Sequence, residues 1–307
     1  MKDRYVLALT IGLLSSSFLS AQVSFGGKPV GIKAAKIGLA APPVERMPEV
    51  DVAPLMAEDE ARLAEGNKGP YRFGYNHSVH LGMDNSGAWD VLPNGDRLWR
   101  LALECPGALS VNFVFDEYVV PEGARVFVYN DAGEVLGAFT AQSNPGHTEL
   151  GVTQLSGERI TVEYHEPAAI AGQGRLHINQ VTHAYRDVLG LMKGLGDSGS
   201  CNNNVVCPEG IPWDDQIRSV AMITVGGSGI CTGQLINNCT QDGTPYFLTA
   251  NHCLSGGVGS WVFRFNWNSP TCATTTNGPT NQTVSGASLL VNSGGSDVAL
   301  LELNSTP

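Results

Sequence analysis

The chain has 307 residues, of which 42% are hydrophobic and only 15% are charged. This length and composition allow one or two domains with sizeable cores, and the 37 Gly and 17 Pro residues favour turn-rich β structure over helical bundles. The net charge of −11 lacks the basic footprint that binding to nucleic-acid phosphates requires, so we expect no nucleic-acid partner.

Residues 1–21 have the features of a secretory signal peptide. Lys2 and Arg4 form a short basic start, an apolar stretch follows from Val6 to Leu19, and Ala21 provides a small residue at the end. A transmembrane anchor is the alternative, but the apolar stretch is shorter than the roughly 18–20 residues that a span requires. We therefore predict a secreted, periplasmic or cell-surface protein whose mature form has no membrane segment.

Residues 22–69 contain Gly-Gly and Pro-Pro pairs, and their irregular composition favours a linker. A short Ala- and Glu-rich run from Met56 to Glu65 is compatible with an amphipathic helix, but the linker is the preferred interpretation.

Residues 70–193 are predicted to form a β-sandwich. The stretches 97–103, 109–115 and 124–129 alternate apolar and polar residues, and turn residues separate them at intervals of about ten residues. No catalytic constellation stands out here. The six histidines of this region are scattered singly, so each is expected to be a surface or core residue rather than a ligand or base; they are His77, His80, His147, His165, His177 and His183.

A Gly/Ser-rich joint at 194–200 marks the boundary with a second domain, residues 194–307. Six cysteines gather in this domain, at positions 201, 207, 231, 239, 253 and 272, whereas Cys105 lies far upstream. In an exported chain such a cluster predicts disulfide bonds. A zinc site is the rival interpretation, but the closely spaced Cys pairs of zinc modules are missing. We therefore predict no metal and no cofactor.

The strongest functional signal is Thr249-Ala-Asn-His-Cys253, which follows an apolar strand. A disulfide from Cys253 to Cys231 would hold the loop that carries His252, and a catalytic base needs such positioning. This pattern resembles the histidine loop of trypsin-like serine proteases. The stretch Asp297-Val-Ala-Leu-Leu301 resembles the segment that carries the acid of their catalytic triad. The resemblance implies that His252 is the general base and that Asp297 orients it.

Gly196-Asp-Ser-Gly-Ser200 resembles the nucleophile motif of the same family. It precedes His252, which is the wrong order for the family, and it lies in a flexible joint, whereas a nucleophile needs a rigid turn with oxyanion-hole donors. Ser198 is therefore not assigned as the nucleophile.

The second domain resembles bacterial lysyl endopeptidases more closely. The likeness includes Ser200 to Gly210, Cys231-Thr-Gly-Gln-Leu-Ile236 and Ser296 to Asn304, and it covers essentially all of residues 194–307. It implies disulfides Cys231–Cys253 and Cys207–Cys272, and a partner for Cys201 beyond Pro307. Cys239 departs from the family pattern, so Cys239 and Cys105 are left either free or in an extra bridge.

The resemblance implies an all-β protein: a β-sandwich propeptide domain followed by the first β-barrel of a chymotrypsin/trypsin-like, two-barrel protease. The expected function is that of a secreted serine endopeptidase precursor that cuts proteins or peptides after lysine. The nucleophilic serine would lie beyond this chain, so the 307 residues alone should be inactive. We expect the sandwich to contact the protease domain, and cleavage at Lys193–Gly194 to release the mature end.

Two alternatives remain. The chain could be a catalytically inactive protease relative, which a substituted serine downstream would reveal. It could also be a secreted β-sandwich binding or adhesion module, which would keep the sandwich attached to the mature protein.

Overall fold

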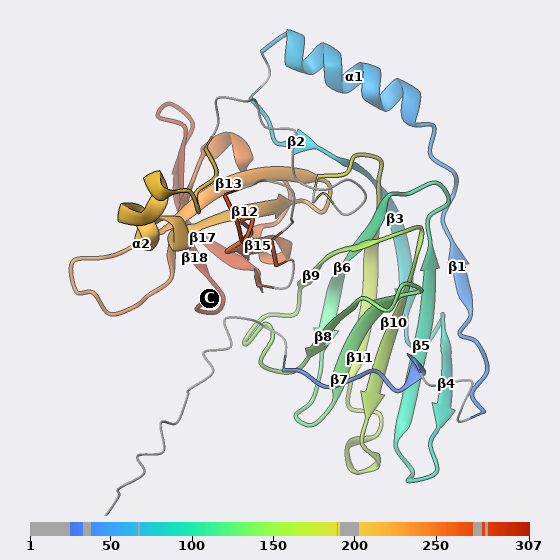
Figure 1. The fold of residues 1–307 in the computed structure, drawn as a ribbon. Helices are drawn as coiled ribbons and strands as arrows, with labels where there is room; N and C mark the ends of the chain where they lie inside the picture. The colour runs from blue at the N-terminus through green and yellow to red at the C-terminus, as the bar shows by residue number, and fades with distance from the viewer. Residues whose placement is uncertain are drawn as a thin grey trace, which may run out of the picture.

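The computed structural model describes residues 25–32, 38–66, 68–188, 190, 203–272, 278–279 and 282–307. The protein is mostly β-sheet with few helices, as the sequence predicts (Figure 1). The signal peptide, the Lys193–Gly194 bond, Ser198 and Cys201 all lie outside the described residues. Within the described ranges, no helix combines the length and the apolar character that crossing a bilayer requires.

Two sheets make up the part of the chain between residues 38 and 188, here called the two-sheet part. The first sheet has the order β1-β5-β10-β7-β8, with β4 also paired to β5. Its strands are β1 (Val44–Arg46), β4 (Ala88–Val91), β5 (Arg97–Glu104), β7 (Arg125–Asn130), β8 (Val135–Phe139) and β10 (Arg159–Glu166). The second sheet has the order β3-β11-β6-β9. Its strands are β3 (Gly74–Gly82), β6 (Ser110–Val119), β9 (Leu150–Ser156) and β11 (Arg175–Ala184).

Side chains from both sheets form one hydrophobic cluster. Trp99 and Leu101 of β5 enter it from the first sheet, and Phe113 and Phe115 of β6 enter it from the second. Each pair is two residues apart because alternate residues of a strand point to the same face. The period-two pattern of the sequence therefore corresponds to the faces that bury this core. A 3-10 turn, η2 (Ala168–Ile170), connects β10 to β11.

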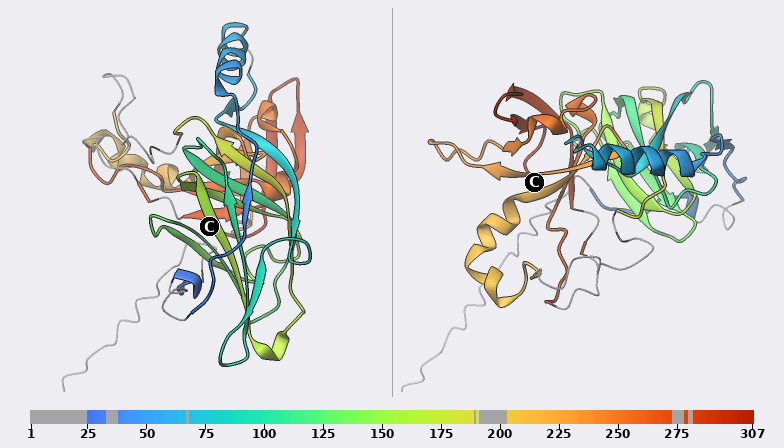
Figure 2. Two further views of the ribbon diagram at one scale, coloured as in Figure 1. Left: turned by 90° about the vertical axis from the view of Figure 1, so that its right-hand side faces the viewer. Right: turned by 90° about the horizontal axis from the view of Figure 1, so that it is seen from above.

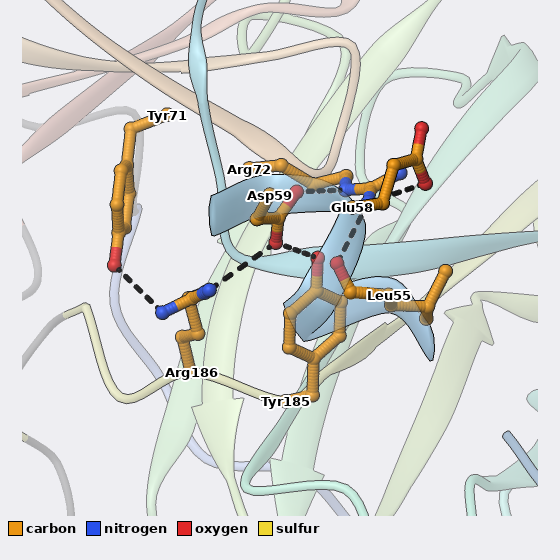
Figure 3. Close-up of polar contacts among 7 residues, drawn as sticks. All are labelled: Leu55, Glu58, Asp59, Tyr71, Arg72, Tyr185 and Arg186. Carbon is orange, nitrogen blue, oxygen red and sulfur yellow. Dashed lines mark hydrogen bonds and ion pairs between the residues drawn. The ribbon is translucent and has the colours of Figure 1, made fainter. Parts of the chain in front are cut away.

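The segment interpreted as a linker contains helix α1 (Val52–Ala64), which corrects that interpretation. Asp51 caps the N-terminus of the helix, because its carboxylate accepts a hydrogen bond from the Ala53 N–H. Its buried Asp59 contacts Arg72, Tyr185 and Arg186 (Figure 3). These polar contacts with distant residues attach the helix to the two-sheet part, and the local composition gives no sign of them.

The C-terminal part, residues 203–307, is one curled sheet with the order β16-β15-β12-β13-β14-β18-β17. Its strands are β12 (Val220–Val225), β13 (Gly229–Ile236), β14 (Tyr246–Thr249), β15 (Val262–Phe265), β16 (Thr283–Ser285), β17 (Ala287–Ser293) and β18 (Val298–Leu303). Its short helical segments are η3 (Pro208–Trp213), α2 (Asp214–Ser219), η4 (Asn251–Cys253) and η5 (Val258–Ser260). A second hydrophobic cluster, with Phe247, Trp261 and Phe263 among its members, fills the inside of the curl.

The two parts lie beside each other (Figure 2) and contact through the turn between β12 and β13. Asn112 Nδ2 donates to the Gly227 carbonyl at 2.9 Å. Asn76 Nδ2 and Gln180 Nε2 donate to the Gly226 carbonyl at 2.9 and 3.1 Å. These amides stand on strands β6, β3 and β11, so the outer face of the second sheet receives the turn.

Two further regions join the parts. Strand β2 (Tyr71–Arg72) belongs to the upstream chain but pairs antiparallel with the beginning of β13. At another place, Ser285 Oγ donates to the Gly151 carbonyl at 2.9 Å. Residue 151 has room only for glycine, because a Cβ there would lie 2.0 Å from the Ser260 carbonyl oxygen. At this place the backbones of the two parts therefore lie close together, and a hydrogen bond joins them.

Candidate active site

His252 lies on the short helical turn η4, directly after strand β14. Cys253 beside it forms a disulfide with Cys231 of β13, with the two Cα atoms 6.1 Å apart. At the end of β14, Thr249 Oγ1 donates to the Thr232 carbonyl of β13 at 2.9 Å. A covalent bond and a hydrogen bond thus hold the histidine turn against β13, which restricts the positions that the imidazole can take.

Asp297 lies in the turn between β17 and β18, one residue before β18 begins. Because β18 pairs antiparallel with β14, with Ala299 opposite Thr249, this turn lies next to η4. Asp297 has a φ of 52°, in the left-handed region that few residues other than Gly, Asn and Asp adopt. Such a backbone conformation outside glycine is frequent at functional sites, where the surrounding structure holds it.

The Asp297 carboxylate binds His252 through both of its oxygens. Oδ2 lies 2.7 Å from His252 Nδ1, and Oδ1 accepts the backbone N–H of His252 at 2.9 Å. These hydrogen bonds, side chain first, lower the pKa of Asp297, and the charge of Lys68 adds to the effect. The acid is therefore held as a carboxylate, and it fixes both the backbone and the ring of His252.

This geometry determines which histidine nitrogen can act as a base. A carboxylate accepts hydrogen bonds but does not donate them, so the proton of a neutral His252 lies on Nδ1. The lone pair is then on Nε2. An imidazole in this tautomer, oriented by a carboxylate, can take a proton from a hydroxyl group and can be stabilised as an imidazolium. Both side chains are partly exposed, at 36% for His252 and 42% for Asp297.

Two contributions to this site have no signal in the sequence. Lys68 comes from the upstream chain, which the pairing of β2 with β13 attaches to the C-terminal part that carries Asp297. Asn292 Nδ2 donates to Asn251 Oδ1 at 2.6 Å, which links β17 to the residue before His252. Lysines and asparagines in loops are common, so a pattern search has no reason to select either Lys68 or Asn292.

A metal site at this position is excluded by the sulfur chemistry. The ligand atoms of Cys231, His252 and Cys253 lie within 4.8 Å of one another, but both sulfurs belong to one disulfide. A cysteine binds a metal ion as a thiolate, and a sulfur in a disulfide is not a thiolate.

A second disulfide joins Cys207 to Cys272. The two bonds are the pairings that the resemblance implies. Among the described residues, Cys105 is buried and unbonded and Cys239 is exposed and unbonded. Burial raises the pKa of the Cys105 thiol to about 12, so this cysteine stays a thiol near neutral pH.

Comparison with known proteins gives two matches. Residues 195–307, which include both His252 and Asp297, match the family described as "Lysyl endopeptidase, C-terminal domain". Over 96% of its length the chain is 27% identical to the lysyl endopeptidase of Pseudomonas aeruginosa, and the alignment spans 66% of that relative. Together the two matches show that the chain is similar to lysyl endopeptidases, and that residues 195–307 are similar to their C-terminal domain.

Proposed function

We propose that the chain is the N-terminal part of a secreted serine endopeptidase precursor that hydrolyses peptide bonds after lysine. The observation that carries the proposal is the pair of hydrogen bonds from His252 to Asp297 within residues 195–307, the range that matches the family. The preference for lysine is proposed from the name of the relative. The nucleophilic serine is proposed to lie in sequence that follows Pro307. The 307 residues alone are then inactive.

In the proposed mechanism, the serine hydroxyl attacks the carbonyl carbon of the substrate while His252 Nε2 accepts the hydroxyl proton. The imidazolium then gives this proton to the leaving amine, and a second cycle with water releases the acyl group. Asp297 keeps the tautomer correct and stabilises the imidazolium. Its lowered pKa favours this role, because the carboxylate remains charged at any pH where the histidine works as a base.

We also propose that the two-sheet part is a propeptide sandwich whose link to the C-terminal part is cut at Lys193–Gly194. Its hydrogen bonds to Gly226 and Gly227 support this assignment, because they hold the two parts together even when the chain between them is cut. The strand β2, which pairs with β13, supports it as well. After cleavage these contacts would keep the two products together.

The test uses the full-length precursor, including the sequence after Pro307. The wild-type protein, His252→Ala and Asp297→Asn are assayed on peptide anilides that end in lysine, arginine or leucine. We expect His252→Ala to lower kcat by about a million-fold, and Asp297→Asn, which favours the wrong tautomer, by about 10⁴-fold. His147→Ala, an exposed histidine in the two-sheet part, is the control and should keep full activity.

N-terminal sequencing of the same samples tests processing. Wild-type protein should begin at Gly194, whereas His252→Ala should stay uncut if the protease processes itself. Full activity in His252→Ala would refute the proposed function, and a preference for leucine would refute the proposed specificity alone. A mature end far from Gly194 would refute only the processing site.

A further inference from the structure

Three side chains on neighbouring strands form a row on the outer face of the second sheet, away from the site above. His80 stands on β3, His177 on β11 and Asp116 on β6, and the sheet order places β11 between the other two. The residues on either side of His80, Val79 and Leu81, pack against the core. Alternation along β3 therefore directs His80 to the opposite, solvent-facing side.

The central member of the row, His177, contacts both others. Its Nδ1 lies 2.5 Å from Asp116 Oδ1, and its Nε2 lies 2.6 Å from Nδ1 of His80. The ring centroids of the two histidines are 4.2 Å apart. Because a carboxylate only accepts, Asp116 keeps a proton on His177 Nδ1, which directs the lone pair of a neutral His177 at His80 through Nε2.

This arrangement contains the parts of a metal site. Histidines that bind metal ions nearly always donate their other N–H to a carboxylate, carbonyl or water, which fixes the tautomer and raises the basicity of the ligand. His177 with Asp116 has this form. His80 adds a second imidazole whose Nδ1 faces the same point. The exposed position of His80 leaves its ring free to rotate by the small amount that inserting an ion requires.

The Asp84 carboxylate lies on the His177 side of the pair. Gly82, opposite His177 in the β3–β11 register, has no side chain, and Asp84 Oδ1 occupies the adjoining space. Asp84 Oδ1 and His177 Cδ2 lie 2.7 and 3.4 Å from the point where a β-carbon of residue 82 would be. The missing side chain at Gly82 thus leaves space between Asp84 and the His177 ring.

We propose that His80 and His177 bind a divalent transition-metal ion of the zinc class. Zn–N bonds are about 2.0–2.1 Å long, so a tetrahedral ion would need the two nitrogens to move from 2.6 Å to roughly 3.3 Å apart. Asp116 would orient His177 from outside the coordination sphere, and water would complete the sphere. Imidazole nitrogens suit zinc better than they suit calcium or magnesium, which prefer oxygen ligands.

The experiment measures zinc binding by the 307-residue chain rather than catalysis, so its result does not depend on the proposed protease function. Protein freed of metal with EDTA is titrated with ZnCl₂ at pH 7.5 by isothermal calorimetry. We expect the wild type to bind one ion per chain, and His80→Ala and His177→Ala to lose this site. Asp116→Asn should bind zinc with an affinity reduced about 10- to 100-fold. His147→Ala and Cys239→Ser are controls and should bind like wild type.

Thermal unfolding gives a second readout that separates ligand loss from misfolding. Zinc that binds only the folded state raises the Tm, so the wild type should gain stability with zinc and the two histidine variants should not. When all proteins are measured in EDTA, the variants should have the same Tm as the wild type. The proposal is overturned if the wild type takes up no zinc, or if His80→Ala and His177→Ala bind it as well as the wild type does. In that case the row is only a hydrogen-bonded chain.

Discussion

His77 and His183 are buried histidines, with 8% and 1% of their surface exposed. Within the described residues, His77 Nε2 and both ring nitrogens of His183 lack hydrogen-bond partners. Burial lowers the pKa of both side chains from the usual value of 6.5, and for His183 the neighbouring His77 adds to the effect. Both imidazoles are therefore neutral in the folded protein under conditions where the unfolded chain would protonate them.

This difference predicts acid sensitivity of the two-sheet part. Well above pH 6.5 both states carry neutral histidines, and these groups do not change the stability. As the pH falls below 6.5 the unfolded chain binds more protons than the folded one, so the free energy of unfolding decreases. We expect the urea midpoint to fall between pH 7.5 and 5.5, and to fall less in the double variant His77→Leu, His183→Leu.

Carboxylates also titrate near the lower limit of this range, so the comparison is between the pH slopes of the two proteins and not between single values. The exposed His147→Ala variant should keep the wild-type slope. Equal slopes in wild type and double variant would mean that the buried histidines do not cause the acid sensitivity.

The histidines also show what the sequence can predict at this scale. His252 and Asp297 each belong to a short motif in which neighbouring residues carry the signal, so the sequence alone is enough to select both as candidates, and the structure brings them into contact. The other histidines stand singly in the sequence, yet His80 and His177 are in contact. That contact depends on the register between β3 and β11, which shifts at an irregularity between Ile178 and Gln180. No local pattern predicts such a shift.

Among the secondary-structure elements, helix α1 depends on one buried acid. Asp59 accepts hydrogen bonds from Arg72 Nε at 2.7 Å and from the Tyr185 hydroxyl at 2.8 Å, and it contacts Arg186 at 3.3 Å (Figure 3). The exposed fractions of the two arginine side chains are 23% and 18%. Removing the carboxylate would leave two partly buried cations without this partner, which is costly.

We expect Asp59→Ala to lower the free energy of unfolding by about 2 kcal/mol, since hydrogen bonds to charged groups contribute about 1.5–3 kcal/mol each. Glu60→Ala changes an exposed residue of the same helix and should stay within about 0.5 kcal/mol of wild type. Urea unfolding followed by circular dichroism measures both. If Asp59→Ala were as stable as Glu60→Ala, the helix would be attached by other contacts.

The same helix shows why the linker interpretation of this segment is wrong. Between Met56 and Glu65 the composition permits a helix but does not require one, because an isolated helix of this length is marginal in water. The deciding contacts are with Arg72, Tyr185 and Arg186, which the fold supplies from elsewhere in the chain. The strands are easier to predict because their alternation already reflects the faces that bury the core.

For the whole molecule, the fit between the two parts is closest at Gly151. A methyl group there would meet the Ser260 carbonyl oxygen, which is backbone and cannot rotate away. We expect Gly151→Ala to push the parts apart at this point and to cost about 1–3 kcal/mol, the range for overpacking. Urea unfolding gives the size of the effect, and hydrogen exchange of residues 258–263 gives its location.

Gly295→Ala is the matched control, because a Cβ at Gly295 meets no atom within 4 Å and no positive φ is required there. It should unfold like the wild type and keep the same exchange pattern. Unchanged stability in Gly151→Ala would show that the parts separate easily at this point.

The order of the strands along the chain affects how the protein is made. All strands of the second sheet end before residue 185, whereas Gly226 and Gly227 come later. During synthesis, N-terminal units generally fold first, while the chain grows by about 5–20 residues per second. Asn76, Asn112 and Gln180 can therefore be in place seconds before the turn that they bind leaves the ribosome. The strands of the later sheet then assemble against a finished template, and the search for their correct register starts from a fixed point.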